Sequence, residues 1–577
     1  MIWYLEDYRR HRREREALDA LASSADWLIP LGWRIDKELH LTWDADIVVP
    51  AGTRSISLRY PNHFPHSLPL VLPRGVEERW SGHQYGSGGE LCLEFGPDNW
   101  HPDLTGADMV ASAYRLLEGE QPSRGQAGEV ASRHVTTLGQ ELRAERSRFL
   151  ITRAQADFFM GMADHTLLTA KALLLFHEHS LIKLISSVAI PGGEIWRDAL
   201  PAPLTLNPER DIVIGRLPSG ALWPSTQSLE DFRTDASLQG FDLPDVKLVV
   251  LVRGSRIRAY YLDNDNGVTQ TSVIPPESEA HRLDDDHKAL QPRKVAVIGC
   301  GSLGSKIAVM LARGGVGSFI LVDDDLLMPD NFVRHDLDWR DVGTHKADSV
   351  AARIQLVNPA TICKVRKHRL GGQESGGGVE SLIESLAECD LLIDATAEPT
   401  VFNYLCAAVA IGKKPLLWAE VFGGGFGGLI ARHRPGIEPS PPAMRSIVEN
   451  WCADRGQRIA RPAKRYDGGP ELLAIADDAD VTVIAAHAAR MAIDLLIPRD
   501  PSMFPNSVYL IGLSKEWLFS QPFETYPIDV GSPEPAPAIE DDNPEVMTEE
   551  VERIRTLFQE YKNATSPSEP SDTTLDQ

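Results

Sequence analysis

A glycine-rich turn directly after a short apolar run restricts the fold of this chain more than any other feature. The run Val295–Ile298 leads into Gly299-Cys-Gly301-Ser-Leu-Gly304. Glycines at this spacing let the backbone approach a phosphate, while the N-terminus of the following helix faces the anion. Asp323 ends the next apolar run, where an acidic side chain binds a ribose. The pattern predicts a doubly wound α/β sheet that binds a nucleotide at the carboxyl ends of its strands.

The length of 577 residues is more than one hydrophobic core supports, so a multidomain protein is expected. Residues 289–520 alternate strand and helix patterns, as in a doubly wound parallel sheet. Residues 521–577 are acidic and proline-rich, and apart from a helix at Thr548–Tyr561 they are expected to be mostly disordered. The predicted strands of the sheet are Val295–Ile298, Phe319–Val322, Leu391–Ile393 and Leu416–Leu417.

The first 288 residues predict two α+β domains. Residues 1–150 combine helical patterns over residues 2–23 and 126–150 and at Met109–Leu117 with strands at Gly32–Trp43, Arg54–Tyr60 and Leu68–Leu72. Residues 151–288 predict a linker or docking domain without a catalytic constellation. Its elements are a helix near Thr166–Leu181 and the strands Lys247–Val252 and Ile257–Leu262, the second ending at the hairpin turn Asn264–Gly267.

Composition and charge exclude several classes of function. The net charge of −24 argues against nucleic acid or an anionic membrane as the main partner. No run reaches the roughly 18 apolar residues that would span a bilayer, and the N-terminus lacks the apolar core of a signal peptide. The 6 cysteines include no C-x-x-C pair, so a cysteine-based zinc site is not expected. The sequence therefore predicts a cytoplasmic protein.

A second motif lies near the N-terminus, where Gly89-Glu-Leu-Cys92-Leu is followed by Trp100-His-Pro102. A cysteine between two leucines is, by itself, more often a core thiol than a nucleophile. The spacing, however, resembles the G-x-[IL]-C-L turn and W-x-P of ubiquitin-conjugating enzymes. Phe64-Pro65 and Pro69 resemble the upstream proline signature of that family. The resemblance covers roughly residues 1–150 and implies that Cys92 carries an acyl group as a thioester.

One departure from that family concerns the H-P-N stretch before the cysteine. Its asparagine supports the oxyanion that forms when an amine attacks the thioester, but this chain has His83-Gln84-Tyr85 there. Gln84 and Asn99 are candidates for the missing amide donor. Asp98 and His101 are candidates to orient or deprotonate the incoming lysine, against the simpler reading of solvated loop residues.

The glycine-rich turn is followed by polar residues that a dinucleotide site does not require. Asp325, Asn331, Arg334 and Lys346 come after Asp323 at the spacing of the ThiF/MoeB activating enzymes, which this part of the chain resembles over about residues 290–500. When a carboxylate attacks the α-phosphate of ATP, pyrophosphate leaves, and its charge requires cationic donors. The resemblance therefore favours ATP activation over an NAD-dependent oxidoreductase.

The resemblance also implies roles for these residues. Asp323 would bind the ribose, with Asp325 as a weaker neighbour, and the phosphates would be held by Asn331, Arg334 and Lys346. Relatives place a magnesium-binding aspartate where this chain has Ala397. The Mg²⁺ role is therefore expected to shift, and Asp394 is the candidate for it, with Glu398 as the alternative.

A relay thiol is also expected, because relatives that form thioesters carry a cysteine on a loop beyond the next strand. Cys452 is the only cysteine beyond Leu416–Val421, and its sequence neighbours are polar, as a reactive thiol requires. The alternative is an incidental loop cysteine. Structural roles are expected for Cys300, Cys363, Cys389 and Cys406.

Together the two sites predict a fused activating and conjugating enzyme. ATP and Mg²⁺ would activate the C-terminal carboxylate of a protein modifier with a flexible tail, and a thioester relay would deliver it to a target lysine. The domain order is similar to the antiphage fusions of bacterial CBASS operons, which implies a ubiquitin-like protein or a cGAS-like nucleotidyltransferase as the modifier. A homodimer is expected by the same resemblance. The alternatives are a sulfur-carrier activator like ThiF or MoeB, an NAD-dependent oxidoreductase and a non-catalytic adaptor.

Overall fold

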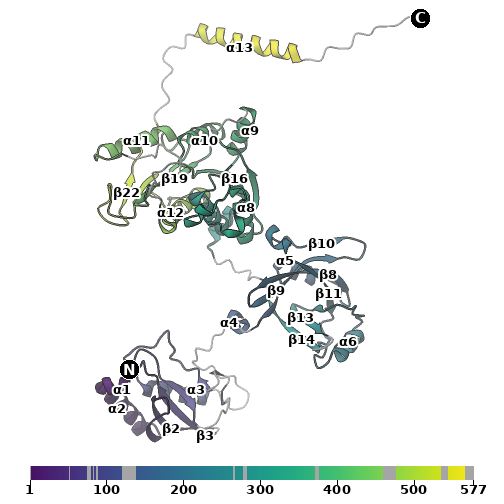
Figure 1. The fold of residues 1–577 in the computed structure, drawn as a ribbon, viewed down its shortest axis with the longest axis vertical. Helices are drawn as coiled ribbons and strands as arrows, with labels where there is room; N and C mark the ends of the chain where they lie inside the picture. Colours follow the sequence, from purple (N-terminus) through teal and green to yellow (C-terminus); the bar gives the residue numbers. More distant parts are fainter. Residues whose placement is uncertain are drawn as a thin grey trace, which may run out of the picture. The chain divides into compact units, whose positions relative to one another are not determined.

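The computed structural model describes residues 2–50, 52–74, 80–81, 83–85, 89–119, 138–143, 145–263, 267–276, 283–370, 376–458, 476–533 and 544–565. The chain divides into two compact units, Met1–Glu145 and Arg146–Gln577 (Figure 1). Predictions for Gly82, for residues 120–137 and for the turn residues 264–266 lie outside the described residues.

The first unit is an α+β domain built on a four-stranded antiparallel meander. The predicted strand Gly32–Trp43 is in fact two strands, because a tight turn at residues 36–40 reverses the chain within it. The described part of residues 126–150 contains only a short helix, α4 (Leu138–Leu142), and a strand, β7 (Ser147–Leu150). The prediction of helix throughout this range is therefore wrong. The elements are α1 (Trp3–Glu6), α2 (Tyr8–Ser24), β1 (Leu28–Ile35), β2 (Leu41–Val49), β3 (Gly52–Tyr60), β4 (Leu70–Pro73), β5 (Gln84–Tyr85), β6 (Glu90–Leu91), α3 (Gly106–Gly119) and α4 (Leu138–Leu142).

A buried charge cluster ties helix α2 to the segment that follows Cys92. The Glu14 carboxylate is fully buried and accepts from Arg10 Nε at 2.9 Å, Tyr60 Oη at 2.9 Å and the Gly106 N–H at 2.7 Å. Arg10 also donates to the carbonyls of Pro102 and Leu104. A buried carboxylate needs such partners, because its desolvation is otherwise uncompensated. The cluster therefore fixes the start of α3 and the Trp100–Thr105 loop in place.

The second unit begins with a closed β-barrel, accompanied by α5 (Arg153–Met160) and α6 (Leu229–Leu238), where the sequence predicts an α+β linker or docking domain. Each strand pairs with the next in the order β9-β7-β14-β13-β12-β11-β8, and the pairing of β8 with β9 closes the ring. β10 (Ile195–Arg197) pairs with the other end of β9. The ring strands are β7 (Ser147–Leu150), β8 (Leu167–His177), β9 (Ser180–Ala189), β11 (Glu209–Leu217), β12 (Leu248–Arg253), β13 (Arg256–Asp263) and β14 (Gly267–Ile274).

This barrel corrects one prediction and confirms two others. The helix predicted near Thr166–Leu181 is wrong, because that segment is β8 and the start of β9. In β8, Leu168, Ala170 and Ala172 face the core with exposed residues between them, a period of two that outweighs the apolar run at its end. The strands predicted at Lys247–Val252 and Ile257–Leu262 are confirmed as β12 and β13, and β13 forms a hairpin with β14.

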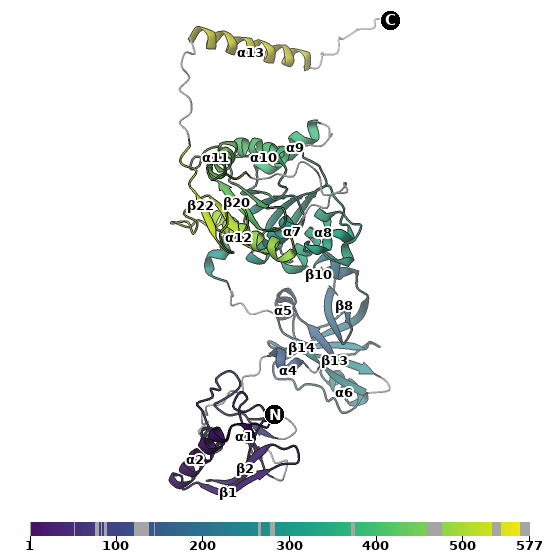
Figure 2. The ribbon, with the colours of Figure 1, turned by 60° about the vertical axis from the view of Figure 1, so that its left-hand side comes forward.

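The doubly wound sheet is confirmed in the rest of this unit. Its order is β17-β16-β15-β18-β19-β20-β21-β22, and the first five strands are parallel. Helices α7, α8 and α12 cover one face, and α9, α10 and α11 cover the other (Figure 2). The strands are β15 (Lys294–Ile298), β16 (Ser318–Val322), β17 (Ile362–Arg366), β18 (Leu391–Asp394), β19 (Leu416–Val421), β20 (Gly427–His433), β21 (Val508–Gly512) and β22 (Thr525–Ile528). The helices are α7 (Ser302–Gly314), α8 (Lys346–Val357), α9 (Gly376–Ala387), α10 (Pro399–Gly412), α11 (Pro441–Ala453) and α12 (Asp478–Leu496).

The sheet extends further along the chain than the sequence indicates. β22 pairs with β21, so an ordered strand lies beyond the predicted domain end at residue 520. The predicted helix at Thr548–Tyr561 is confirmed within α13 (Pro544–Thr565). In the described part of the chain, no helix is long and apolar enough to cross a membrane.

The cluster around Glu14 yields a stability prediction. Glu14→Ala leaves the buried Arg10 without its carboxylate, so we expect a loss of about 3 to 5 kcal/mol in the unfolding free energy of the first unit. Urea denaturation of the full chain, followed by tryptophan fluorescence, measures it. Glu16→Ala is the matched control, because its pair with Arg12 is exposed on the same helix and should contribute about 0.5 kcal/mol or less. An equal effect of both variants would contradict the assigned role of Glu14.

Candidate functional site

The glycine turn between β15 and α7 has the geometry of a phosphate-binding loop. Gly299 has a φ of +85°, and a side chain there would collide with Thr396 and Ala395. A Cβ on Gly304 would lie 1.8 Å from the Gly299 carbonyl oxygen, so the turn closes only with glycine at that position. Around Gly301, by contrast, nothing lies within 4 Å of the equivalent position, and no side chain caps the N-terminus of α7. The helix N-terminus can therefore receive an anion.

Asp323 holds the turn from the end of β16. Its Oδ2 accepts from the Cys300 N–H at 2.7 Å, and its Oδ1 accepts from the Asp325 N–H at 2.9 Å. Burial raises the pKa of Asp323, while these hydrogen bonds and Lys346 oppose the rise. Lys346, the first residue of α8, pairs through Nζ with Asp325 Oδ2 at 2.9 Å, and its N–H donates to the Asp325 carbonyl. The structure thus brings Asp323, Asp325 and Lys346 together.

Asn331 and Arg334 lie on the connection from β16 to α8. Asn331 Oδ1 accepts from the Met328 N–H at 2.9 Å, which ties it to its own turn. Arg334 is half-buried, and its neighbour His335 reaches the glycine turn, where Nε2 lies 2.8 Å from the Cys300 carbonyl oxygen. Arg334 therefore lies near that turn, because it directly precedes His335.

His335 is a site residue that the sequence analysis missed. Its Nε2 donates to Cys300 O and its Nδ1 accepts from the Leu337 N–H at 3.2 Å, which defines a neutral ring. Burial lowers the pKa of His335 to about 4, and Lys346 and Lys306 act in the same direction. The signal was weak, because a histidine next to Arg334 is not distinctive in a sequence.

Lys306 was missed as well. It lies on α7 just past the glycine turn and is 6% exposed, and its Nζ pairs with Asp478 Oδ1 at 2.7 Å. Asp478 is the first residue of α12. The pair joins α7 and α12 on the same face of the sheet. It also fixes the buried Lys306 cation on the helix that follows the nucleotide turn.

Asp394, the candidate Mg²⁺ ligand, ends β18 beside the glycine turn. It is 3% exposed, and its Oδ1 accepts from the Thr396 N–H at 3.0 Å and hydroxyl at 2.7 Å. Burial raises its pKa to about 6; the Thr396 bonds oppose this and the charge of Glu420 adds to it. Glu420 is itself paired with Arg445 at 3.0 Å. Asp394 thus offers an anionic oxygen near the phosphate turn, whereas Ala397 offers none.

The Cys92 turn is anchored by its neighbours. Leu91 and Leu93 are buried in the core of the first unit, while Cys92 itself is half-buried. The Cys92 N–H donates to the His83 carbonyl at 2.7 Å, and Trp100 Nε1 donates to the Pro65 carbonyl at 2.7 Å. The backbone on either side of this half-buried residue is therefore fixed by hydrogen bonds and by burial.

The side-chain amides of Gln84 and Asn99, the two candidate donors to the oxyanion, both form hydrogen bonds within the loops around Cys92. Gln84 is buried; its Oε1 accepts from the Trp80 and Ser81 N–H groups, and its Nε2 donates to the Gly89 carbonyl at 2.9 Å. Asn99 accepts from the Gly96 N–H at 2.7 Å and donates to the Glu94 carbonyl at 3.1 Å. Both amides brace the loops around Cys92.

The other candidates near Cys92 lie on its exposed downstream loop. Asp98 is exposed, and the exposed His101 accepts through Nδ1 from the Asp103 N–H at 3.2 Å. The roles suggested for Asp98 and His101 toward a lysine stay predictions.

The prediction that Cys452 lies in a polar loop is wrong. The residue lies on α11 instead of a polar loop, and it is fully buried in the core cluster with Met444 and Val448. Burial raises the pKa of Cys452 to about 11, so the thiolate that a relay needs is scarce in this arrangement. Polar neighbours in the sequence were misleading, because a helix turns every fourth residue toward the core.

The remaining cysteines of this unit have structural environments. Cys300 and Cys389 are buried, and Cys363 and Cys406 are half-buried. Burial raises the pKa of Cys363, Cys389 and Cys406 to about 11 and that of Cys300 well above its usual range.

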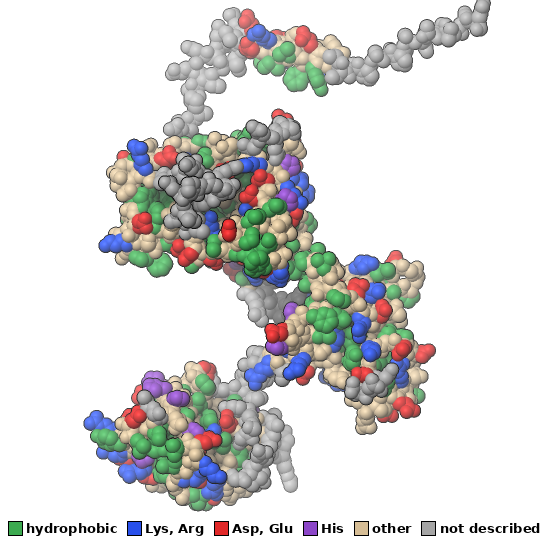
Figure 3. Space-filling view, viewed as in Figure 1, with side chains coloured by type: hydrophobic (Ala, Val, Ile, Leu, Met, Phe, Trp, Pro, Cys, Tyr) green, Lys and Arg blue, Asp and Glu red, His purple; other side chains and the backbone are tan. Residues whose placement is uncertain are grey.

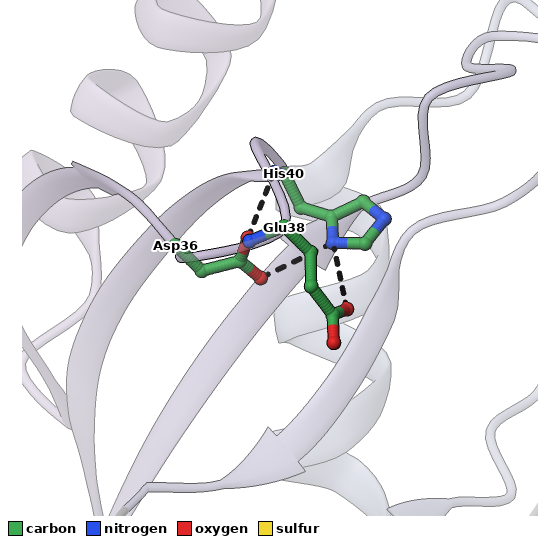
Figure 4. A group of neighbouring side chains, drawn as sticks. All are labelled: Asp36, Glu38 and His40. Carbon is green, nitrogen blue, oxygen red and sulfur yellow. Dashed lines mark hydrogen bonds and ion pairs between the residues drawn. The ribbon is translucent and has the colours of Figure 1, made fainter.

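Asp36, Glu38 and His40 form a compact group in the turn between β1 and β2, and their ligand atoms lie within 4.8 Å of one another (Figure 4). Asp36 Oδ1 accepts from the N–H groups of Glu38 at 2.9 Å and His40 at 2.8 Å, and its Oδ2 lies 3.2 Å from His40 Nδ1. These bonds stabilise the turn, and we assign no metal to it.

Comparisons with known proteins match parts of this description. Residues 280–447 match the ThiF family. The uncharacterized protein y4qC of Sinorhizobium fredii is 30% identical over 501 residues, which cover 78% of this chain and 83% of y4qC. The ATP-dependent ubiquitin transferase-like protein Cap2 of Pseudomonas aeruginosa is 33% identical over 131 residues, 22% of each chain. A crystal structure of E. coli MccB with AMPCPP and MccA is 18% identical over 44% of this chain and 68% of MccB, with a TM-score of 0.33, too low to bear on fold or function.

The buried His335 predicts a pH dependence of stability. Its folded pKa of about 4 lies below the ordinary 6.5, so the unfolded chain binds the proton first and stability falls as pH drops from 6.5 toward 4. The contribution is about 3 kcal/mol. Urea unfolding of wild type and His335→Gln at pH 7 and pH 5 measures it, and the variant should lose less stability on acidification. Equal losses would contradict the neutral ring.

Proposed function

We propose a function from one premise: this chain belongs to the protein family of y4qC, and its residues 280–447 form a ThiF-family domain. The ThiF match indicates an adenylyltransferase-like enzyme that uses ATP to activate a carboxylate. The observation that carries the finer proposal is the presence, in one chain, of an open phosphate-binding turn at Gly301 and a half-buried cysteine, Cys92, in an anchored turn.

The first step is adenylation. The phosphates of ATP lie over Gly301 and the N-terminus of α7, within reach of Lys346 and Arg334, and Asp323 binds the ribose. A carboxylate oxygen of the substrate attacks the α-phosphorus, and the bond to the bridging oxygen of pyrophosphate breaks. Lys346 and Arg334 offset the charge that develops on pyrophosphate. Mg²⁺ would be held by Asp394 and by the phosphates, and it supplies further charge neutralisation.

The second step stores the acyl group on sulfur. The Cys92 thiolate attacks the mixed anhydride, AMP leaves, and a thioester forms. A target lysine then attacks the thioester carbon, which gives an isopeptide bond and restores the thiol. The fixed turn at Leu91–Leu93 supports this role, because both leucines are buried while Cys92 between them stays half-buried. We assign no relay step to Cys452 because its thiol is buried.

The substrate is a protein modifier with a flexible C-terminal tail, either a ubiquitin-like protein or a cGAS-like nucleotidyltransferase. The name of the relative Cap2, an ATP-dependent ubiquitin transferase-like protein, supports this class. We also propose a role in bacterial antiviral defence, because the domain order resembles that of the antiphage fusions of CBASS operons. Conjugation targets are lysines of other proteins.

The functional unit is a homodimer paired through the ThiF-family domain. Four apolar side chains on the connection beside the nucleotide turn support this pairing, since they are 44% to 73% exposed: Leu326, Met328, Val333 and Trp339. Apolar surface next to a functional site marks an interface in soluble proteins.

A second candidate function is activation of a sulfur carrier, as in other ThiF-family enzymes. The ThiF match alone supports it equally well. That activity would not require Cys92, and this difference separates the two.

The nucleotide site predicts a defect for Lys346→Ala. Loss of this cation should lower the rate of pyrophosphate exchange into ATP by about 100-fold, because one charge-assisted contact to the developing anion disappears. The exchange is measured with labelled pyrophosphate and a candidate modifier protein that has a flexible C-terminal tail. Lys367→Ala is the control, since Lys367 pairs with Asp348 at the surface and should keep the wild-type rate. Unchanged exchange in Lys346→Ala would exclude its role in the adenylation step.

The thiol assignment predicts opposite results for two cysteines. Cys92→Ala should keep pyrophosphate exchange but lose the thioester adduct between chain and modifier. That adduct is seen on a non-reducing gel and disappears when the sample is treated with a thiol reducing agent. Cys452→Ala should still form that adduct at a rate within about twofold of wild type, because its thiol is buried with a raised pKa. Loss of the adduct in Cys452→Ala would show that it relays the acyl group after all. An adduct that survives Cys92→Ala would support the sulfur-carrier alternative.

A further inference from the structure

Helix α13 carries an apolar stripe along one of its sides. Val551, Ile554, Phe558 and Tyr561 are 44% to 65% exposed, although each is large and hydrophobic. Figure 3 shows hydrophobic side chains gathered on one side of this helix, with charged ones beside them. Scattered apolar residues on a surface need no explanation, but a continuous stripe along a helix indicates a partner.

The spacing of the stripe identifies the kind of partner. The steps between these four residues are three, four and three positions, which is the a/d repeat of a coiled coil. Val551 and Phe558 occupy a positions, and Ile554 and Tyr561 occupy d positions. Leu557, at 61% exposure, lies at the adjoining g position and widens the stripe. A two-stranded or higher helical bundle is the structure that buries such a seam.

The charges beside the seam select a second copy of the same helix. Glu550 falls at a g position and Arg555 at the e position of the next heptad. In a parallel pair, g of one helix faces that e of its partner, so Glu550 meets Arg555 twice by symmetry. In an antiparallel pair, e positions face one another, and Arg555 lies near cations. Within one helix, Glu550 pairs with Arg553 and Arg555 pairs with Glu552, and both pairs are exposed and therefore worth little.

We propose that α13 pairs with α13 of a second copy of this chain as a parallel coiled coil, with Val551, Ile554, Phe558 and Tyr561 in the seam. The parallel arrangement has a two-fold axis along the helices, which closes a dimer without leaving a free face. The proposal rests on α13 alone and does not depend on the activity proposed above.

Cross-linking in the full-length chain tests the pairing. Ile554→Cys places a thiol at a d position, where the two copies face each other, and mild oxidation should give a disulfide-linked dimer. Thr556→Cys is the matched control on the outer f position of the same helix, and its dimer yield should be at least about tenfold lower, because the sulfur atoms lie too far apart. The wild-type chain measures the background from its own cysteines. Equal yields from both variants would overturn the proposal.

A charge swap tests orientation and partner together. Glu550→Arg in the Ile554→Cys background should lower the cross-linking yield, and Arg555→Glu added to it should restore the yield, because the attractive pairs are rebuilt with reversed sign. A cross-linking yield that stays the same in both variants would exclude parallel pairing through these residues. Preferential cross-linking of Val551→Cys with Tyr561→Cys in mixed samples would show an antiparallel pair, in which a positions face d positions, and would also contradict the proposal.

Discussion

The contact of Asp323 with the Cys300 N–H is the interaction on which the nucleotide site depends. It joins the ends of β15 and β16 at the point where the chain turns into α7. The turn closes because Gly304 lies against the Gly299 carbonyl oxygen, a distance that no side chain permits. His335 holds the same turn from the other side through the Cys300 carbonyl. Peptide groups on both sides of Cys300 are therefore fixed, and Gly301 is presented to solvent with its neighbours already in place.

The sequence was informative where a pattern is local and repeated. The alternation of short apolar runs and helices predicted the doubly wound sheet, and the glycine spacing located its nucleotide turn. The resemblance to ThiF/MoeB enzymes implied that Asp323, Asp325 and Lys346 act together, and the structure places them together, while their roles toward a nucleotide stay predictions. The barrel was not predictable in the same way. Its closure depends on the pairing of β8 with β9 and of β7 with β14, and the second pair joins strands more than a hundred residues apart.

Cys452 and Cys92 show how a cysteine's sequence neighbours can mislead in both directions. Cys452 has polar neighbours yet lies in the core, because α11 turns it inward with Met444 and Val448. Cys92 has leucine neighbours yet is only half-buried, because both leucines lie in the core while the residue between them does not. Periodicity decided both cases. His335 and Lys306 escaped notice for a different reason, since their partners Cys300 O and Asp478 become neighbours only after folding.

The closed ring of the barrel limits how other proteins can bind to it. A sheet with free borders can recruit an extended peptide as an extra strand, but a closed ring has no unsatisfied row of backbone groups. Among the described strands of this barrel, the outer border of β10, three residues long, and the part of β14 that precedes its pairing with β7 at Ser272 remain for that mode. A ligand of this domain would have to recognise its loops or its outward side chains, so its specificity would reside in residue identity rather than in backbone geometry.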